Sequence, residues 1–287
     1  MGFDAVLAWT GSDDPATRRA KIRAFETVFL VGLASEAIHG ALRFSNAPDG
    51  WLRPLLVVAF ALVAQWERVR RIALCALLAT SLAQIAGSFP LTANHVFLQL
   101  YILALFVVCD IERPEEQALF LDSARWLFWL VFFFAGVQKL VHGYYDHGEY
   151  FASNLSRESF ASVWALITPT AEFERLSALT YTAGSGPFRF DSPLALALSN
   201  AAWATEIAIP VLLLFDRTRP LAVWGAVGFI IFTEWMAREL HFGALFVAGI
   251  LLYAPTPAIR RALPLFALFY AVLFAARIGW LPGITFY

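Results

Sequence analysis

The feature that most constrains this chain is a succession of long apolar segments along almost its whole length. Hydrophobic residues make up 60% of the 287 residues, and only 15% are charged. A soluble domain averages about 45–50% apolar and about 25% charged residues, and a helix needs about 20 apolar residues to cross a bilayer. The sequence therefore predicts an all-α integral membrane protein, a polytopic bundle of about nine transmembrane helices. The predicted spans cover residues 24–44, 52–67, 71–90, 93–111, 123–142, 192–215, 219–236, 240–255 and 261–281.

Basic residues predict the orientation of these spans. They gather before the first span and in the loops after spans two, six and eight, at Arg18, Arg19, Lys21, Arg23, Arg68, Arg70, Arg71, Arg217, Arg219, Arg260 and Arg261. Cytoplasmic loops carry such an excess, so we expect a multi-pass protein of the inner cell membrane with its N-terminus inside and its C-terminus outside. Residues 1–23 then form a cytoplasmic lead-in without a cleavable signal peptide, and residues 24–287 form one transmembrane domain.

The longest connection, residues 143–191, is expected on the extracytoplasmic side. Residues 159–168 are apolar enough for a short interfacial helix, and Pro169 and Thr170 end it and start another. Glu172 and Glu174 would lie in the first turn of that second helix, where the helix dipole favours acidic groups. Long structured loops often serve as lids or binding elements, and the alternative is an interfacial packing segment.

The net charge argues against nucleic-acid binding, and the positions of the cysteines argue against a structural disulfide. A net charge of −1 gives no electrostatic footprint for nucleic acid. The two cysteines, Cys75 and Cys109, are expected near the cytoplasmic ends of their spans, where a structural disulfide does not persist.

Ionisable residues inside the predicted spans are the candidates for function, because charged groups in hydrocarbon are costly. Most of them share the outer half of the membrane in the predicted topology: Glu36, His39, His95, Lys139, Glu234 and His241. Convergence of titratable groups at one depth predicts an extracytoplasmic site. His142 and His147 flank a turn, and we expect both to be solvent-exposed structural residues.

Lys139 and Glu206 each have two interpretations. Lys139 is one of only two lysines, and burial can free a lysine amine to act as a base, whereas a structural lysine would extend its head to the interface. Glu206 lies in mid-span before Pro210 and needs a partner or a proton, which a plain helix–helix hydrogen bond would also supply. A metal site from Glu36, His39 and His95 is a further alternative, although five dispersed histidines cannot build a di-iron centre, and no metal is predicted.

Three stretches of the sequence resemble one family of membrane proteins. They are TANHVFLQLYILAL, with Asn94 and His95 opening a span, FFFAGVQKLVHGYYDHGEYF around Lys139, and ELHFGALFVAGILLYAP beginning near His241. A fourth, ATEIAIPVLLLFDRTRP around Glu206, is similar to a Glu–Pro–Leu–Arg pattern of the same family. Together, over roughly residues 24–256, they resemble the horizontally transferred transmembrane domain, the membrane part of vitamin K-dependent γ-carboxylase.

This resemblance implies a chemistry and assigns roles to residues. Lys139 matches the base that activates reduced vitamin K, a hydroquinone or menaquinol-like cofactor, and His95, with Asn94 beside it, matches a residue that helps to hold the quinol. His241 matches another polar position of the active-site face. The implied reaction uses O₂ to convert the quinol to an epoxide through a strongly basic alkoxide. That alkoxide removes a γ-proton from a glutamyl residue of a peptide or protein, and the carbanion takes up CO₂.

One departure from the family leaves the function open. The animal carboxylases carry a large lumenal domain that binds their substrates, and nothing comparable is expected here, so a separate soluble subunit is a candidate partner besides membrane lipid. The alternatives are a quinol-dependent membrane enzyme that modifies another peptide or small molecule without carboxylation, and a non-enzymatic scaffold or a protein of peptide maturation or immunity. We expect His95, Lys139 and His241 to line one apolar, aromatic outer cavity.

Overall fold

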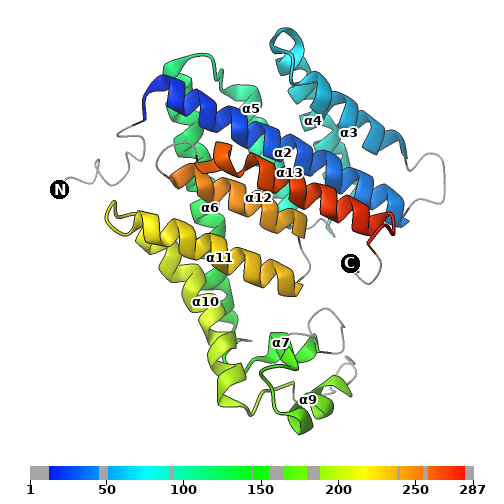
Figure 1. The fold of residues 1–287 in the computed structure, drawn as a ribbon, viewed down its shortest axis with the longest axis vertical. Helices are drawn as coiled ribbons and strands as arrows, with labels where there is room; N and C mark the ends of the chain where they lie inside the picture. Colours follow the sequence, from blue (N-terminus) through cyan, green and yellow to red (C-terminus); the bar gives the residue numbers. More distant parts are fainter. Residues whose placement is uncertain are drawn as a thin grey trace. The chain divides into compact units, whose positions relative to one another are not determined.

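A computed structural model describes residues 13–44, 51–90, 94–143, 145–155, 164–179, 188–237, 240–254 and 258–281. The regular structure of these residues is helical, and they contain no strand (Figure 1). The predicted all-α class is therefore confirmed for the described part of the chain.

Each of the nine predicted apolar segments contains a helix. These helices are α2 (Pro15–Phe44), α3 (Leu52–Val63), α4 (Glu67–Ser88), α5 (Asn94–Val108), α6 (Pro114–His142), α10 (Pro193–Leu213), α11 (Arg219–Ala237), α12 (Leu240–Ile250) with the 3-10 turn η2 (Leu251–Tyr253), and α13 (Ala258–Arg277). Apolar periodic runs are the strongest helix signal in a sequence, which is why the positions agree.

Five of the described helices are long and apolar enough to cross a membrane, namely α2, α4, α6, α10 and α13. The others have shorter apolar stretches. The 12 residues of α3 give a length of about 18 Å at 1.5 Å per residue, which is less than the hydrocarbon thickness of about 30 Å. Nine complete spans therefore remain a prediction, because hydropathy marks apolar runs and does not show where a helix ends.

The first helix begins earlier than the predicted span. The predicted span starts at residue 24, whereas α2 starts at Pro15. Asp14 caps it: the Thr17 backbone N–H donates to Asp14 Oδ1 over 2.9 Å, and the Thr17 hydroxyl donates to Oδ2 over 2.8 Å. These hydrogen bonds hold the pKa of the Asp14 carboxyl below its usual value. A capping Asp followed by Pro is a strong helix start, and it extends the helix into the predicted polar lead-in.

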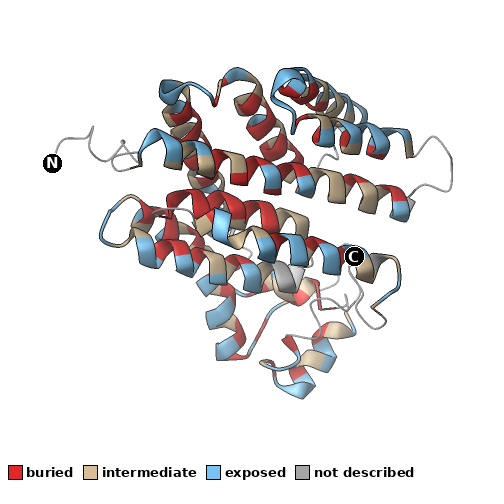
Figure 2. Cartoon of the chain, turned by 45° about the horizontal axis from the view of Figure 1, so that its top comes forward, coloured by how far each residue is buried: buried red, intermediate tan, exposed pale blue. Residues whose placement is uncertain are grey.

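The chain forms two compact units. Unit 1 comprises Met1–Leu127 and His241–Tyr287, and unit 2 comprises Phe128–Leu240. Within unit 1, α2 packs against α3 and α13, and α4 packs against α3 and α5. Aromatic rings fill the core of unit 1; the rings of Phe106 and Phe120, for example, lie 4.6 Å apart. Figure 2 shows buried and exposed residues alternating along the helices.

Two buried cations of unit 1 donate hydrogen bonds to backbone carbonyls at the end of η2, the turn that follows α12. Lys21, which is 1% exposed, donates from Nζ to the carbonyl oxygen of Ala254 over 2.9 Å and pairs with Asp13. Arg125 donates from Nε and Nη2 to the carbonyl oxygen of Leu252 over 3.0 and 2.8 Å. The last carbonyls of a helix lack intrahelical partners and favour positive charge. Lys21, which the sequence places in the cytoplasmic lead-in, is thus a buried structural residue.

Unit 2 holds the long connection predicted outside the membrane. Its helices are α7 (Glu149–Ser153) and α9 (Thr170–Ser177), which pack against each other, and α10 packs against α11. The predicted helix start at Thr170 is confirmed, with Glu172 in the first turn. Residues 159–163, the first half of the interfacial helix predicted over residues 159–168, lie outside the described residues, and residues 165–167 of the second half form a turn. Trp164 is 1% exposed and stacks on Phe190 with ring centroids 5.0 Å apart, so the connection has a packed core of its own.

Candidate functional site

In unit 1, the structure brings together four of the predicted site residues: Glu36, His39, His95 and His241. Glu36 and His39 lie one turn apart in the second half of α2, whereas His95 lies in the first turn of α5 and His241 in the first turn of α12. Three helices that are separate in the sequence thus contribute titratable side chains to one polar cluster. We call these four residues the histidine cluster.

Glu36 is the centre of one half of the histidine cluster. His95 Nε2 lies 3.0 Å from Glu36 Oε1, and Gln99 donates from Nε2 to Glu36 Oε2 over 2.6 Å. Because Gln99 is one turn beyond His95 on α5, a single helix face supplies a partner to each carboxylate oxygen. With the His95 Nε2 proton directed at Glu36, the Nδ1 atom becomes a hydrogen-bond acceptor.

His241 is the centre of the other half. Its Nε2 lies 3.0 Å from the Ser35 hydroxyl oxygen, and its ring meets the His39 ring edge to face at 4.9 Å and 69°. The Tyr270 ring of α13 lies 6.2 Å from the His241 ring. α13 approaches α2 so closely that a Cβ on Gly32 would lie 2.7 Å from the Tyr270 hydroxyl oxygen. This half is therefore polar at its centre and aromatic at its edge.

Sequence reasoning missed three neutral residues that contact the histidine cluster, namely Ser35, Gln99 and Tyr270. Gln99 follows His95 by four residues, and Ser35 precedes Glu36, so helical spacing gave a usable signal for both. Tyr270 had no such signal, because its place depends on the packing of α13 against α2. Among the described side chains, no group of three His, Cys, Asp or Glu residues is arranged to hold a metal ion.

In unit 2, Lys139 and Glu206 form an ion pair. Lys139, in the last turn of α6, donates from Nζ to Glu206 Oε1 of α10. The Tyr145 ring faces the same ammonium group from 5.4 Å, a cation–π distance. The side chains of Lys139 and Glu206 are 22% and 10% exposed. Sequence reasoning named both residues and did not pair them, because 67 residues separate them.

The close approach of α6 and α10 positions this pair. Gly136, one turn before Lys139, packs directly on α10: a Cβ there would lie 2.9 Å from the Trp203 carbonyl oxygen and 2.8 Å from Ile207. Towards the other end of the contact, Trp129 donates from its indole N–H to the carbonyl oxygen of Pro210 over 2.8 Å. Small residues allow such helix contacts in membrane proteins.

The Lys139–Glu206 pair has the properties of a proton acceptor. Glu206 Oε2 is buried and has no hydrogen-bond partner within the described part of the chain, although a buried carboxylate oxygen normally has one. In its resting state the pair shares one titratable proton, which is either on the Lys139 amine or on the Glu206 carboxylate. It can take up a second proton to become an ammonium beside a carboxylic acid, and Oε2 can receive that proton where the resting pair is ammonium and carboxylate.

The remaining candidates fall outside these contacts or outside the described side chains. The side chains of Asn94 and Glu234 lie outside the described residues. His142 and His147 are both exposed, as predicted. Lys139 belongs to unit 2, whereas His95 and His241 belong to unit 1, so the single cavity expected for all three remains a prediction. Comparisons with protein-family models, curated proteins and solved structures find no match to this chain.

Proposed function

We propose that this chain is a membrane enzyme that oxygenates a reduced quinone, in the manner of the vitamin K-dependent γ-carboxylases that its sequence resembles. The observation that carries the proposal is the Lys139–Glu206 pair with its open carboxylate oxygen. The pair occurs in the segments FFFAGVQKLVHGYY and ATEIAIPVLLLF, which resemble that family independently of each other.

In the proposed reaction, the pair removes one proton from a quinol hydroxyl. If the resting pair is ammonium and carboxylate, the proton goes to Glu206, and if it is neutral, the proton goes to the Lys139 amine. Both routes end with the same doubly protonated pair and a quinol anion. A lysine can serve in this way because its amine releases a proton when buried, whereas an arginine guanidinium does not.

The quinol anion then reacts with O₂ and rearranges to an epoxide-bearing alkoxide. This alkoxide is the strong base that removes the γ-proton of a glutamyl side chain, and the carbanion forms a bond to CO₂. The resemblance assigns the binding of the quinol to His95, whose Nε2 lies 3.0 Å from Glu36 Oε1. An apolar membrane setting favours these steps, because water would quench both the alkoxide and the carbanion.

Formation of quinone epoxide by the purified protein tests the proposal. The assay supplies vitamin K hydroquinone or menaquinol and O₂ to wild-type protein in nanodiscs, with and without CO₂ and a glutamyl peptide. Epoxide together with carboxylated peptide supports the complete proposal. Epoxide without carboxylation supports the narrower alternative of a quinol-dependent enzyme with another substrate. Absence of epoxide under both conditions would support the non-enzymatic alternative and refute the proposal.

A further inference from the structure

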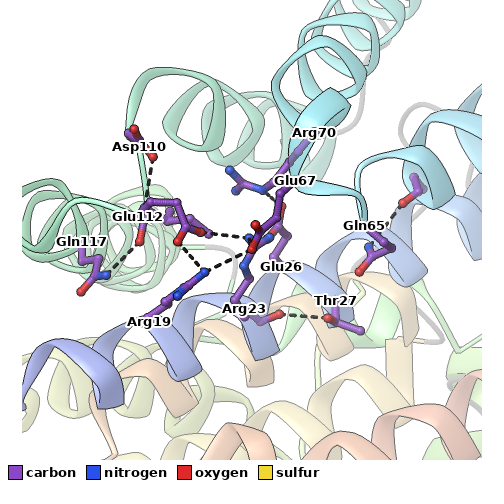
Figure 3. Close-up of polar contacts among 12 residues, drawn as sticks. Arg19, Arg23, Glu26, Thr27, Gln65, Glu67, Arg70, Asp110, Glu112 and Gln117 are labelled. Carbon is purple, nitrogen blue, oxygen red and sulfur yellow. Dashed lines mark hydrogen bonds and ion pairs between the residues drawn. The ribbon is translucent and has the colours of Figure 1, made fainter.

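A charged cavity in unit 1 has no role in the proposed reaction. Neither Lys139 nor any residue of the histidine cluster lines it. It has a volume of about 200 Å³ and an apolar wall that includes Phe106. Six charged residues line it: Arg23, Glu67, Arg70, Arg71, Asp110 and Glu112. They come from α2, from α4 and from the segment that follows α5 (Figure 3). The arginine distribution predicts that this end of the bundle lies at the cytoplasmic face.

The acidic groups of the cavity are already paired. Glu67 accepts hydrogen bonds from Arg19 and Arg23 over 3.2 and 3.4 Å. Glu112 pairs with the same two arginines, at 3.0 Å from Arg23 (Figure 3). Asp110 pairs with Arg113 at 3.4 Å, and it accepts the backbone N–H of Glu112 over 3.1 Å. These carboxylates therefore have little capacity left for a cation.

Two basic groups of the cavity have donors to spare. Arg70, which is 8% exposed, donates from Nε to Glu26 Oε1 over 2.7 Å, and its buried Nη2 has no partner among the described residues. Each oxygen of the Glu26 carboxylate already accepts one hydrogen bond, Oε1 from Arg70 Nε and Oε2 from Arg23 over 3.2 Å, and neither reaches Nη2. Arg71 is exposed at the cavity and makes no ion pair with any described residue. A buried donor without an acceptor is destabilising, so a ligand that supplies acceptor oxygens is expected.

We propose that this cavity binds a phosphate group, with Arg70 and Arg71 donating to its oxygens. A guanidinium matches the geometry of phosphate oxygens and makes short, charge-assisted hydrogen bonds to them. The immediate surroundings point to the phosphate of a lipid headgroup. Ile72 and Val108, each next in sequence to a cavity residue, are 72% and 66% exposed and would be covered by an acyl chain. Basic pockets at the cytoplasmic side of membrane helices bind lipid headgroups in this way.

Native mass spectrometry of the delipidated full-length protein tests this site. The probes are phosphatidylglycerol, diacylglycerol, which lacks the phosphate, and inorganic phosphate. Arg71→Gln removes one charged donor from an exposed position that can be changed without unfolding. Arg68→Gln is the matched control, because Arg68 is an exposed arginine of the same helix that does not line the cavity.

The site predicts one tightly held phosphatidylglycerol, bound about tenfold more weakly by Arg71→Gln and unchanged in Arg68→Gln. Diacylglycerol should bind far more weakly than phosphatidylglycerol. If inorganic phosphate binds and displaces the lipid, the phosphate site is upheld with a second source of ligand. Equal effects of the two arginine variants, equal binding of diacylglycerol, or no binding of either phosphate probe would overturn the proposal. None of these results depends on quinol chemistry.

Discussion

Gly136 of α6 faces the backbone of α10, and a Cβ at this position would lie 2.9 Å from the carbonyl oxygen of Trp203. One turn further along α6, Lys139 meets Glu206 of α10. The absence of a side chain at residue 136 is therefore what allows the two helices to approach and the ion pair to form.

We predict that Gly136→Ala separates α6 from α10 and weakens the Lys139–Glu206 contact. Overpacking of a tight contact costs about 1–3 kcal/mol of stability, and quinol epoxidation should fall with it. The measurement is unfolding in detergent micelles together with the epoxidation rate. Gly228→Ala is the control, because a Cβ on Gly228 of α11 meets nothing within 4 Å. Equal stability of the two variants would show that the close approach has no energetic role.

Glu36 is predicted to act through His95. Glu36→Ala leaves His95 Nε2 and the Gln99 amide without their shared acceptor, and a buried donor such as the Gln99 amide that loses its acceptor costs about 1–3 kcal/mol. We expect KM for the quinol to rise about tenfold with a smaller change in kcat, and Glu36→Gln to retain more affinity than Glu36→Ala. Glu115→Ala, which alters an exposed glutamate of α6, should leave KM unchanged. An unchanged KM in Glu36→Ala would remove Glu36 and its contact with His95 from quinol binding.

Glu172 is predicted to hold the connection between α9 and α10 in place. Its buried carboxylate accepts the backbone N–H of Asp191 and, over 3.2 and 3.1 Å, that of Ser192, directly before α10 begins at Pro193. Glu172→Ala should therefore speed limited proteolysis of residues 143–191 several-fold, because buried amides lose their acceptor. The exposed neighbour Glu174 offers the comparison, since Glu174→Ala should be cleaved at the wild-type rate.

The predicted orientation can be tested with single introduced cysteines in a Cys75→Ala background. Ala178→Cys lies at the exposed end of α9 and Arg68→Cys lies in the first turn of α4. An impermeant maleimide added to intact cells should label Ala178→Cys and leave Arg68→Cys unlabelled until the cells are lysed. The reverse pattern would move the histidine cluster and Lys139 to the cytoplasmic face and invert the topology.

Local patterns in the sequence predicted the helices, and long-range packing determined the rest. Apolar runs located all nine segments, and the Pro169-Thr170 step located the start of α9. The ends of α3 and the early start of α2 depended on turn and capping details that hydropathy does not measure. Lys21 could not be recognised from the sequence as a buried residue, because its acceptor, the carbonyl of Ala254, is 233 residues away.

The sequence likewise predicted one part of the candidate site and not the other. Glu36, His39, His95 and His241 were predicted to share a depth in the membrane, and the structure brings them together through contacts of α2 with α5 and α12. The partnership of Lys139 with Glu206 could not be predicted, because it depends on the angle and separation of α6 and α10. Gly136 was the one local signal for that contact, and helical glycines occur elsewhere without one.

The most direct test of the account is the rate of quinol epoxidation by Lys139→Arg beside wild type in nanodiscs. Arginine retains the positive charge and can still pair with Glu206, but it does not release its proton. If Lys139 and Glu206 together form the base, Lys139→Arg should lose about 10²-fold or more of the activity, the usual contribution of a positioned acid or base. Small added amines should restore part of the activity of Lys139→Ala. Full epoxidation by Lys139→Arg would show that Lys139 is an anchoring charge, and it would contradict the proposed catalytic role.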